Sequence, residues 1–123
     1  MLLVVSLFTV KNGEAREFFV RSLRRGGSWQ STALRIAPQI IDVEVLEHLD
    51  DGAEALCLCL DLWKSTEAYY RACHSPEVQS LFLARRQLAD SSFELGAFAY
   101  PVTPEAGETT ATRLNKFELS EPN

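Results

Sequence analysis

Residues 57–74, CLCLDLWKSTEAYYRACH, hold all three cysteines of the chain, with one of its two histidines and one of its two tryptophans. Thiolates and imidazoles are preferred zinc ligands, so Cys57, Cys59 and His74 would be the simplest metal set in this stretch. Zinc-binding cysteines usually occur as CxxC on tight turns, whereas this CxC lies in an apolar run without a fourth ligand. The sequence therefore predicts no metal, and it favours the cysteines as small core residues.

A second chemistry would be a thiol nucleophile activated by a base, because Cys73 directly precedes His74. Successive residues on a helix point about 100° apart, so these two side chains cannot form the hydrogen bond that such a pair needs. The other groups of chemical interest are Asp61, Trp63 and Tyr69. Their meaning depends on the elements that carry them.

Hydrophobic periodicity divides the chain into strands and helices. Pro76 interrupts the second helical pattern, and Ser-Pro-Glu at this point predicts a helix break at His74 and Ser75 with a new N-cap. The predicted elements are a strand at 2–10, a helix from Ala15 to about Gly26, a short helical turn or irregular connector at 28–39, strands at 40–49 and 54–63, a helix from Ser65 that restarts at Pro76, and a strand at 93–100.

Alternation within these elements predicts which side chains are buried. In the strand at 40–49, Ile41, Val43 and Val45 are expected together on the buried face. On the helix that restarts at Pro76, the apolar residues are expected toward the sheet, and Arg85 and Arg86 toward water.

The order β-α-β-β-α-β predicts an α+β, ferredoxin-like fold, in which a four-stranded antiparallel sheet carries both helices on one face. The strand at 54–63 is apolar on both sides, with four leucines on one side and Cys57, Cys59 and Trp63 on the other. The sheet face without helices therefore needs a cover, and we expect a homodimer that packs sheet against sheet.

A chain of 123 residues fits one domain, which we predict to span 1–101. The tail at 102–123 is rich in Pro, Glu and Thr, and it could add an edge strand at 113–119. The net charge of -5 and basic residues scattered along the sequence argue against a nucleic-acid partner.

The apolar start MLLVVSLFTV has no positive region before it and leads directly into Lys-Asn-Gly-Glu. This pattern predicts a buried strand and neither a signal peptide nor a membrane span. An odd number of cysteines without an export signal is typical of a reducing compartment, so we expect a cytoplasmic protein.

The segment LWKSTEAYYRACHSPEVQSLF resembles the antibiotic biosynthesis monooxygenase family, which consists of dimeric α/β-barrel proteins built on a ferredoxin-like fold. The resemblance covers residues 1–100 and rests on Trp63 at the end of the third strand, the Ser/Glu/Ala helix start, His74 near the helix break and the Ser-Pro restart. It implies the fold and the dimeric barrel. For activity it implies cofactor-free oxygenases of aromatic polyketides, haem-degrading enzymes, or relatives of unassigned activity.

The haem-degrading members of this family, by resemblance, need an Asn in the first strand, a Trp on the third strand and an iron-binding His about two turns past the helix break. Trp63 matches the second requirement, but Ser6 and Phe82 stand near the other two positions. Haem turnover is therefore not expected, and we predict no cofactor.

The cofactor-free oxygenases imply a simpler site. An acidic, electron-rich phenol can be deprotonated to a carbanion that reduces O₂ directly, so the protein must supply a dry aromatic pocket, a base or hydrogen-bond donor, and orientation. Asp61 shares a strand face with Trp63, and His74 stands at the helix break. The candidate residues are His74 and Asp61 as acid–base groups, and Trp63, Tyr69, Trp29 and Arg85 as substrate-binding groups.

Three hypotheses for function remain open on the sequence. The first is a homodimeric, cofactor-independent monooxygenase-like enzyme that acts on a small aromatic or quinol-type molecule. The second is a non-catalytic homodimer that binds a small ligand in the same pocket, and the third is a structural dimer with a filled core. A cavity beside Trp63 with a desolvated base would favour the first.

Overall fold

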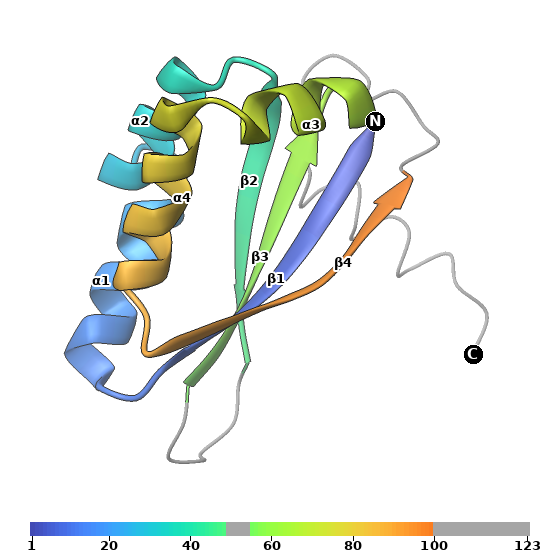
Figure 1. The fold of residues 1–123 in the computed structure, drawn as a ribbon. Coiled ribbons are helices and arrows are strands. Elements are labelled where there is room, and N and C mark those ends of the chain that lie inside the picture. Colours follow the sequence, from blue (N-terminus) through green and yellow to red (C-terminus); the bar gives the residue numbers. More distant parts are fainter. Residues whose placement is uncertain (49–54, 100–123) are drawn as a thin grey trace, which may run out of the picture.

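A computed structural model describes residues 1–48 and 55–99 of the chain (Figure 1). The elements in chain order are β1 (Leu2–Val10), α1 (Gly13–Leu23), α2 (Ser28–Ile36), β2 (Ile40–Glu47), β3 (Ala55–Trp63), α3 (Thr66–Cys73), α4 (Pro76–Gln87) and β4 (Ser91–Ala99). The four strands form one antiparallel sheet in the order β2-β3-β1-β4. Helices α1, α2 and α4 lie on one face of this sheet, and α3 crosses the end at which β1 begins (Figure 1). The predicted ferredoxin-like α+β fold is confirmed.

Some predictions lie outside the described residues. These are the tail at 102–123 and its edge strand at 113–119, so the domain boundary at 101 stays a prediction. Among the helices in the described part of the chain, none is long and apolar enough to cross a membrane.

Residues 28–36 form a regular helix, α2, where the sequence predicted a helical turn or an irregular connector. The helix has a weak start signal, because Gly27 at its N-cap offers no side-chain hydrogen bond. Tertiary contacts hold it instead. Gln30 Nε2 donates to the Val43 carbonyl at 3.1 Å, Trp29 Nε1 donates to the Leu81 carbonyl at 2.9 Å, and Ala33 is fully buried.

The face prediction for β2 is wrong at Ile41, which is 38% exposed while Val43 and Val45 are buried. The cause is an irregularity in the pairing with β3, since Ile40 pairs with Trp63 and Asp42 already pairs with Leu62. Ile41 lies between them and has no pairing partner on β3. This extra residue shifts the alternation of faces, so Ile41 does not share the buried face of Val43 and Val45.

The break between α3 and α4 follows the predicted positions. Ser65 caps α3, and its Oγ accepts a hydrogen bond from the Ala68 amide at 3.0 Å. Helix α3 ends at Cys73 with His74 as C-cap, and α4 begins at Pro76 after Ser75. Pro at the first helical position is favourable because its missing amide proton would have no partner there.

The two faces of the sheet have different surroundings. The main core lies between the sheet and the helices, and Phe8, Phe19, Cys59 and Trp63 are among its fully or almost fully buried members. The opposite face, which we call the open face, carries a smaller buried cluster and several exposed apolar side chains. The cluster consists of Leu3, Leu60 and Leu62, and the exposed residues that pair in register with this face are Leu46, Phe93 and Phe98.

The basic residues are less scattered in space than along the sequence. Arg16, Arg21, Arg24 and Arg25 border a single cleft beside α1. The expectation of scattered basic residues is therefore wrong for this part of the chain, because α1 and the turn after it place all four on one side.

Candidate functional site

A cavity of about 300 Å³ lies between the sheet and helices α3 and α4, in the region where the sequence placed the site. Phe8 from β1, Tyr69 from α3 and Phe82 from α4 supply aromatic walls. Asp61 and Glu94 from the sheet supply carboxylates. Arg86 from α4 adds a guanidinium. The cavity thus combines aromatic surface with charged groups of both signs, which suits a planar ligand that has polar substituents.

Tyr69, which was predicted to bind the substrate, lines the cavity. Its ring packs edge-on against Trp63, with centroids 5.1 Å apart and planes at 71°, and Cys73 also lines the cavity. Burial raises the pKa of the Tyr69 phenol, and the charges of Cys73 and Glu94 raise it further. The phenol therefore remains protonated at neutral pH and can donate a hydrogen bond.

Asp61 lines the cavity but is not a free base. It is 2% exposed, and its two carboxylate oxygens accept hydrogen bonds from Arg85 Nη1 and Nη2, each at 2.8 Å. Burial opposes the positive charge on Arg85, but the charge and hydrogen bonds of Asp61 outweigh that effect and raise the pKa of the guanidinium. The two groups form a buried, bidentate ion pair at the cavity floor.

The prediction that Arg85 faces water is wrong, because only 5% of this residue is exposed. The guanidinium carbon lies 4.7 Å from the ring centroid of Trp29, 5.0 Å from that of Phe82 and 5.3 Å from that of Phe8. Three aromatic rings and one carboxylate therefore enclose this arginine, and a substrate anion would have to displace Asp61 to reach it.

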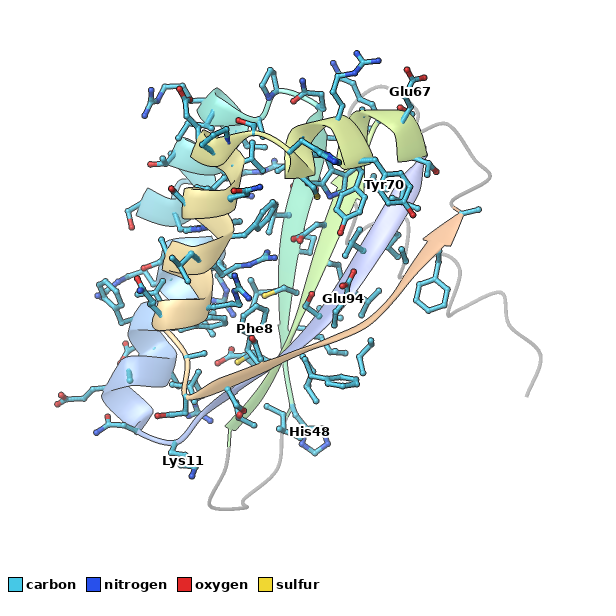
Figure 2. All side chains as sticks on the ribbon, in the orientation of Figure 1. Phe8, Lys11, His48, Glu67, Tyr70 and Glu94 are labelled. Atoms are coloured by element: carbon cyan, nitrogen blue, oxygen red, sulfur yellow. The ribbon has the colours of Figure 1, made fainter. Side chains whose placement is uncertain are left out.

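His74 lies outside the cavity. It is exposed as the C-cap of α3, and its Nδ1 donates to the Tyr70 carbonyl at 2.7 Å. The other histidine, His48, follows the end of β2, at the opposite end of the sheet from Tyr70 (Figure 2). The structure thus brings neither imidazole to the aromatic cavity.

Both tryptophans support the cavity wall from behind. Trp63 is fully buried and packs against Tyr69 and Phe82, and Trp29 packs against Phe82 at 6.1 Å between centroids. Within the described residues, the Trp63 indole nitrogen has no hydrogen-bond partner. Neither indole lines the cavity itself. Replacing Trp29 or Trp63 would therefore affect a bound ligand only indirectly, by shifting the rings of Tyr69 and Phe82.

Sequence reasoning missed the contribution of β4. In the antiparallel pairing, Glu94 stands opposite Ser6 and Ser92 opposite Phe8, and all four residues line the cavity. Figure 2 shows Glu94 on β4 and Phe8 on β1. The alternating polar residues of β4 were a signal, but they are equally typical of an exposed edge strand.

The cysteines take different positions around this site. Cys57 and Cys59 are fully buried in the core, where burial raises the pKa of both thiols, and Cys73 borders the cavity with a pKa raised chiefly by burial. All three are free. Across residues 1–48 and 55–99, no three His, Cys, Asp or Glu side chains gather as a metal site would require.

Comparison with known proteins shows which solved structures share this fold. No protein-family model and no curated protein matches the chain. Among solved structures, SnoaB, a cofactor-independent oxygenase from Streptomyces nogalater, is 23% identical, with 85% of this chain and 97% of that chain covered and a TM-score of 0.53. A candidate antibiotic biosynthesis monooxygenase from Bacillus cereus is 19% identical, with 85% and 97% covered and a TM-score of 0.57.

A dimeric protein of unknown function with a ferredoxin-like fold, from Bacteroides fragilis, is 10% identical, with 80% of this chain and 95% of that chain covered and a TM-score of 0.55. These identities are low, so the likeness concerns the arrangement of strands and helices. The chain shares its ferredoxin-like fold with these three proteins.

Proposed function

We propose that the chain is a member of the antibiotic biosynthesis monooxygenase family and acts as a cofactor-independent monooxygenase on a small aromatic phenol or quinol. The observation that carries this proposal is a cavity whose aromatic walls stand beside a carboxylate, Glu94, and a protonated phenol, Tyr69. Its volume of about 300 Å³ suits a molecule of a few fused rings. The fold shared with SnoaB supports the same proposal.

The proposed reaction converts an activated CH₂ group of the substrate into a carbonyl. Glu94 accepts a proton from the carbon and leaves a resonance-stabilised carbanion. The carbanion transfers one electron to O₂, and the two radicals combine to a carbon-bound peroxide, which takes the proton back from Glu94. Loss of water then gives the carbonyl. The carbon loses four electrons and O₂ gains four, so one oxygen atom enters the product and the other leaves as water.

Tyr69, Asp61 and Glu94 each have a role in this proposal. The oxyanion of the substrate would accept a hydrogen bond from Tyr69, because burial raises the pKa of this phenol and keeps it protonated. Asp61 stays paired with Arg85 and fixes the cavity floor. The role of base, predicted for Asp61 or His74, thus passes to Glu94.

We also propose that two copies pack open face to open face. The observation behind this proposal is the large apolar side chains left exposed there, with Leu46 at 43%, Phe93 at 65% and Phe98 at 54%. The Bacteroides fragilis neighbour, described as dimeric, supports it. Sedimentation at micromolar concentration should give a dimer, and Phe98→Asp should give a monomer; a wild-type monomer would contradict the proposal. A cytoplasmic location stays a prediction, supported by three free thiols.

A specific observation favours the second hypothesis, a non-catalytic dimer that binds a small ligand. The buried carboxylate is neutralised by Arg85, and the remaining one, Glu94, is exposed to solvent. A solvated carboxylate is a weaker base toward carbon acids than a desolvated one. Binding without turnover would follow if no ligand displaces that solvent.

One experiment separates the two functions. Oxygen uptake is measured with a panel of anthrone-like phenols, and binding of the same phenols is followed through quenching of tryptophan fluorescence. Glu94→Gln should lower uptake by about 10²-fold or more while binding persists. His74→Ala is the matched control, because His74 lies outside the cavity, and it should change neither signal. Binding without uptake for every phenol would refute the enzyme and support the binding protein, and absence of both would contradict each.

A further inference from the structure

A second concave site lies beside α1, on a different part of the molecule from the aromatic cavity. We call it the arginine cleft and define it by Arg16, Arg21, Arg24 and Arg25. Its volume is about 600 Å³, twice that of the aromatic cavity, and the two share no lining residue. Helices α1 and α3 stand at opposite ends of the helical layer (Figure 1). A ligand in this cleft would therefore bind independently of the proposed oxygenase chemistry.

The charges of the cleft do not balance. Four guanidiniums face two carboxylates, Glu17 and Glu47, although the whole chain has a net charge of -5. Glu47 is already engaged, since its Oε2 lies 3.1 Å from Arg24 Nη2. In the described part of the chain, neither Arg16 nor Arg25 has an ion pair. Like charges held this close repel one another, and an anion between them relieves the repulsion.

The backbone beneath these arginines is fixed in shape. Gly26 has a φ of 85°, a conformation that side chains rarely adopt. At Gly27, an added Cβ would lie 2.3 Å from the Arg21 carbonyl oxygen, so the turn packs directly onto the last turn of α1. The backbone positions of Arg24 and Arg25 are therefore set by the turn, and only their side chains have to be ordered when a ligand binds.

The spacing of the arginines indicates the kind of anion. Arg16 and Arg24 are eight residues apart, which corresponds to roughly 12 Å along a helix axis. A molecule with two or more separated anionic groups can contact arginines at both ends of the cleft at once, and it neutralises more of the excess positive charge than a single monovalent anion does. Guanidinium can bind both phosphoryl and carboxylate groups in a bidentate manner. We propose that the arginine cleft binds a small polyanion that carries at least two phosphoryl or carboxylate groups.

The test uses the full chain with ¹⁵N-labelled glycine and the probes tripolyphosphate and citrate. The amides of Gly13, Gly26 and Gly27 line the cleft, whereas Gly96 lies on β4 and reports on the other site. Binding should shift the first three signals in a saturable manner and leave Gly96 unchanged. A response to tripolyphosphate alone assigns a phosphoryl ligand, a response to citrate alone assigns a carboxylate ligand, and either supports the proposal.

Two matched double variants provide the control. Arg16→Gln with Arg25→Gln should weaken binding of the responding probe by at least about tenfold, because each removes a charge-assisted contact. Arg35→Gln with Arg71→Gln removes the same net charge from exposed positions elsewhere and should leave affinity within about twofold. Equal losses in both variants would reduce the effect to net charge and overturn the proposal. Absence of saturable shifts up to about 1 mM of either probe would also overturn it.

Discussion

The ion pair between Asp61 and Arg85 is the interior contact whose removal should cost this fold most. Both residues are almost fully buried, and two hydrogen bonds of 2.8 Å join them. Arg85→Met removes both donors and leaves a carboxylate without a partner in an aromatic setting. Loss of one partner of a buried ion pair costs about 3–5 kcal/mol. Two hydrogen bonds to charged groups, at about 1.5–3 kcal/mol each, give about 3–6 kcal/mol, which overlaps this range.

This loss is large beside the total stability of a small domain, which is about 5–15 kcal/mol. Urea unfolding, followed by the fluorescence of the buried Trp29 and Trp63, should show a free energy of unfolding lower by about 3–5 kcal/mol. Arg86→Met is the matched control, since it makes the same change at the next residue of α4, which is exposed. It should change the free energy of unfolding by no more than about 0.5 kcal/mol.

The double variant Asp61→Leu with Arg85→Met distinguishes a coupled pair from two separate losses. Replacing a whole buried ion pair with apolar residues is often neutral or stabilising, so the double variant should be more stable than either single variant. The coupling energy in the double-mutant cycle should reach at least about 2 kcal/mol. If Arg85→Met costs no more than Arg86→Met, or if the double variant costs the sum of the singles, the reasoning is refuted.

Three further predictions concern a cap, a close contact and a titrating group. Ser65→Ala removes the cap of α3 and should lower the free energy of unfolding in urea by about 1 kcal/mol. Ser75→Ala should cost less, because the Ser75 side chain makes no cap hydrogen bond. Equal losses in the two variants would contradict this prediction. In thermal melts, Gly27→Ala should destabilise by at least about 2 kcal/mol through its backbone clash, and Gly13→Ala, which meets no atom within 4 Å, should stabilise by about 0.4–1 kcal/mol. Burial raises the pKa of Tyr69, so the folded state holds this proton more tightly, and the resulting stability is complete below about pH 10 and lost as the pH rises further. Urea unfolding between about pH 9 and about pH 11 should show a steeper loss for the wild type than for Tyr69→Phe; parallel curves would count against the buried phenol.

Local patterns sufficed for much of the fold, because each correctly predicted element has its signals within its own segment. Ser65 at an N-cap and Pro76 at a first helical turn act on neighbouring backbone, so their effect is visible in the sequence. Helix α2 is different, since its start has no capping side chain and its hydrogen bonds to Val43 and Leu81 come from other elements. The exposure of Ile41 likewise depends on pairing with another strand.

The site was partly predictable for the same reason. Asp61 and Trp63 are two residues apart on β3 and so lie on the same face of the strand. Arg85 lies seven residues after Val78 and four after Leu81, which places it on the buried stripe of α4. A buried carboxylate and a cation on a buried stripe could have been paired from the sequence, but the usual exposure of arginine argued against it. The position of Glu94 was out of reach, because it depends on the register of β4 against β1, including an irregularity beside Val5.

The open face and the cavity meet at Phe93. This residue pairs with Leu7, whose side chain belongs to the open face, yet it also borders the cavity. Every residue of β4 except Gly96 is exposed, so the cavity has helices on one side and a bare edge strand on the other. A second copy packed on the open face would bury Phe93 and exclude water from this side of the cavity. Carbanion chemistry with O₂ needs such a dry site, since water would solvate the base and protonate the intermediate. The proposed dimer would then be a physical condition of the proposed activity, and oxygen uptake per chain should fall on dilution below the dissociation constant of the dimer.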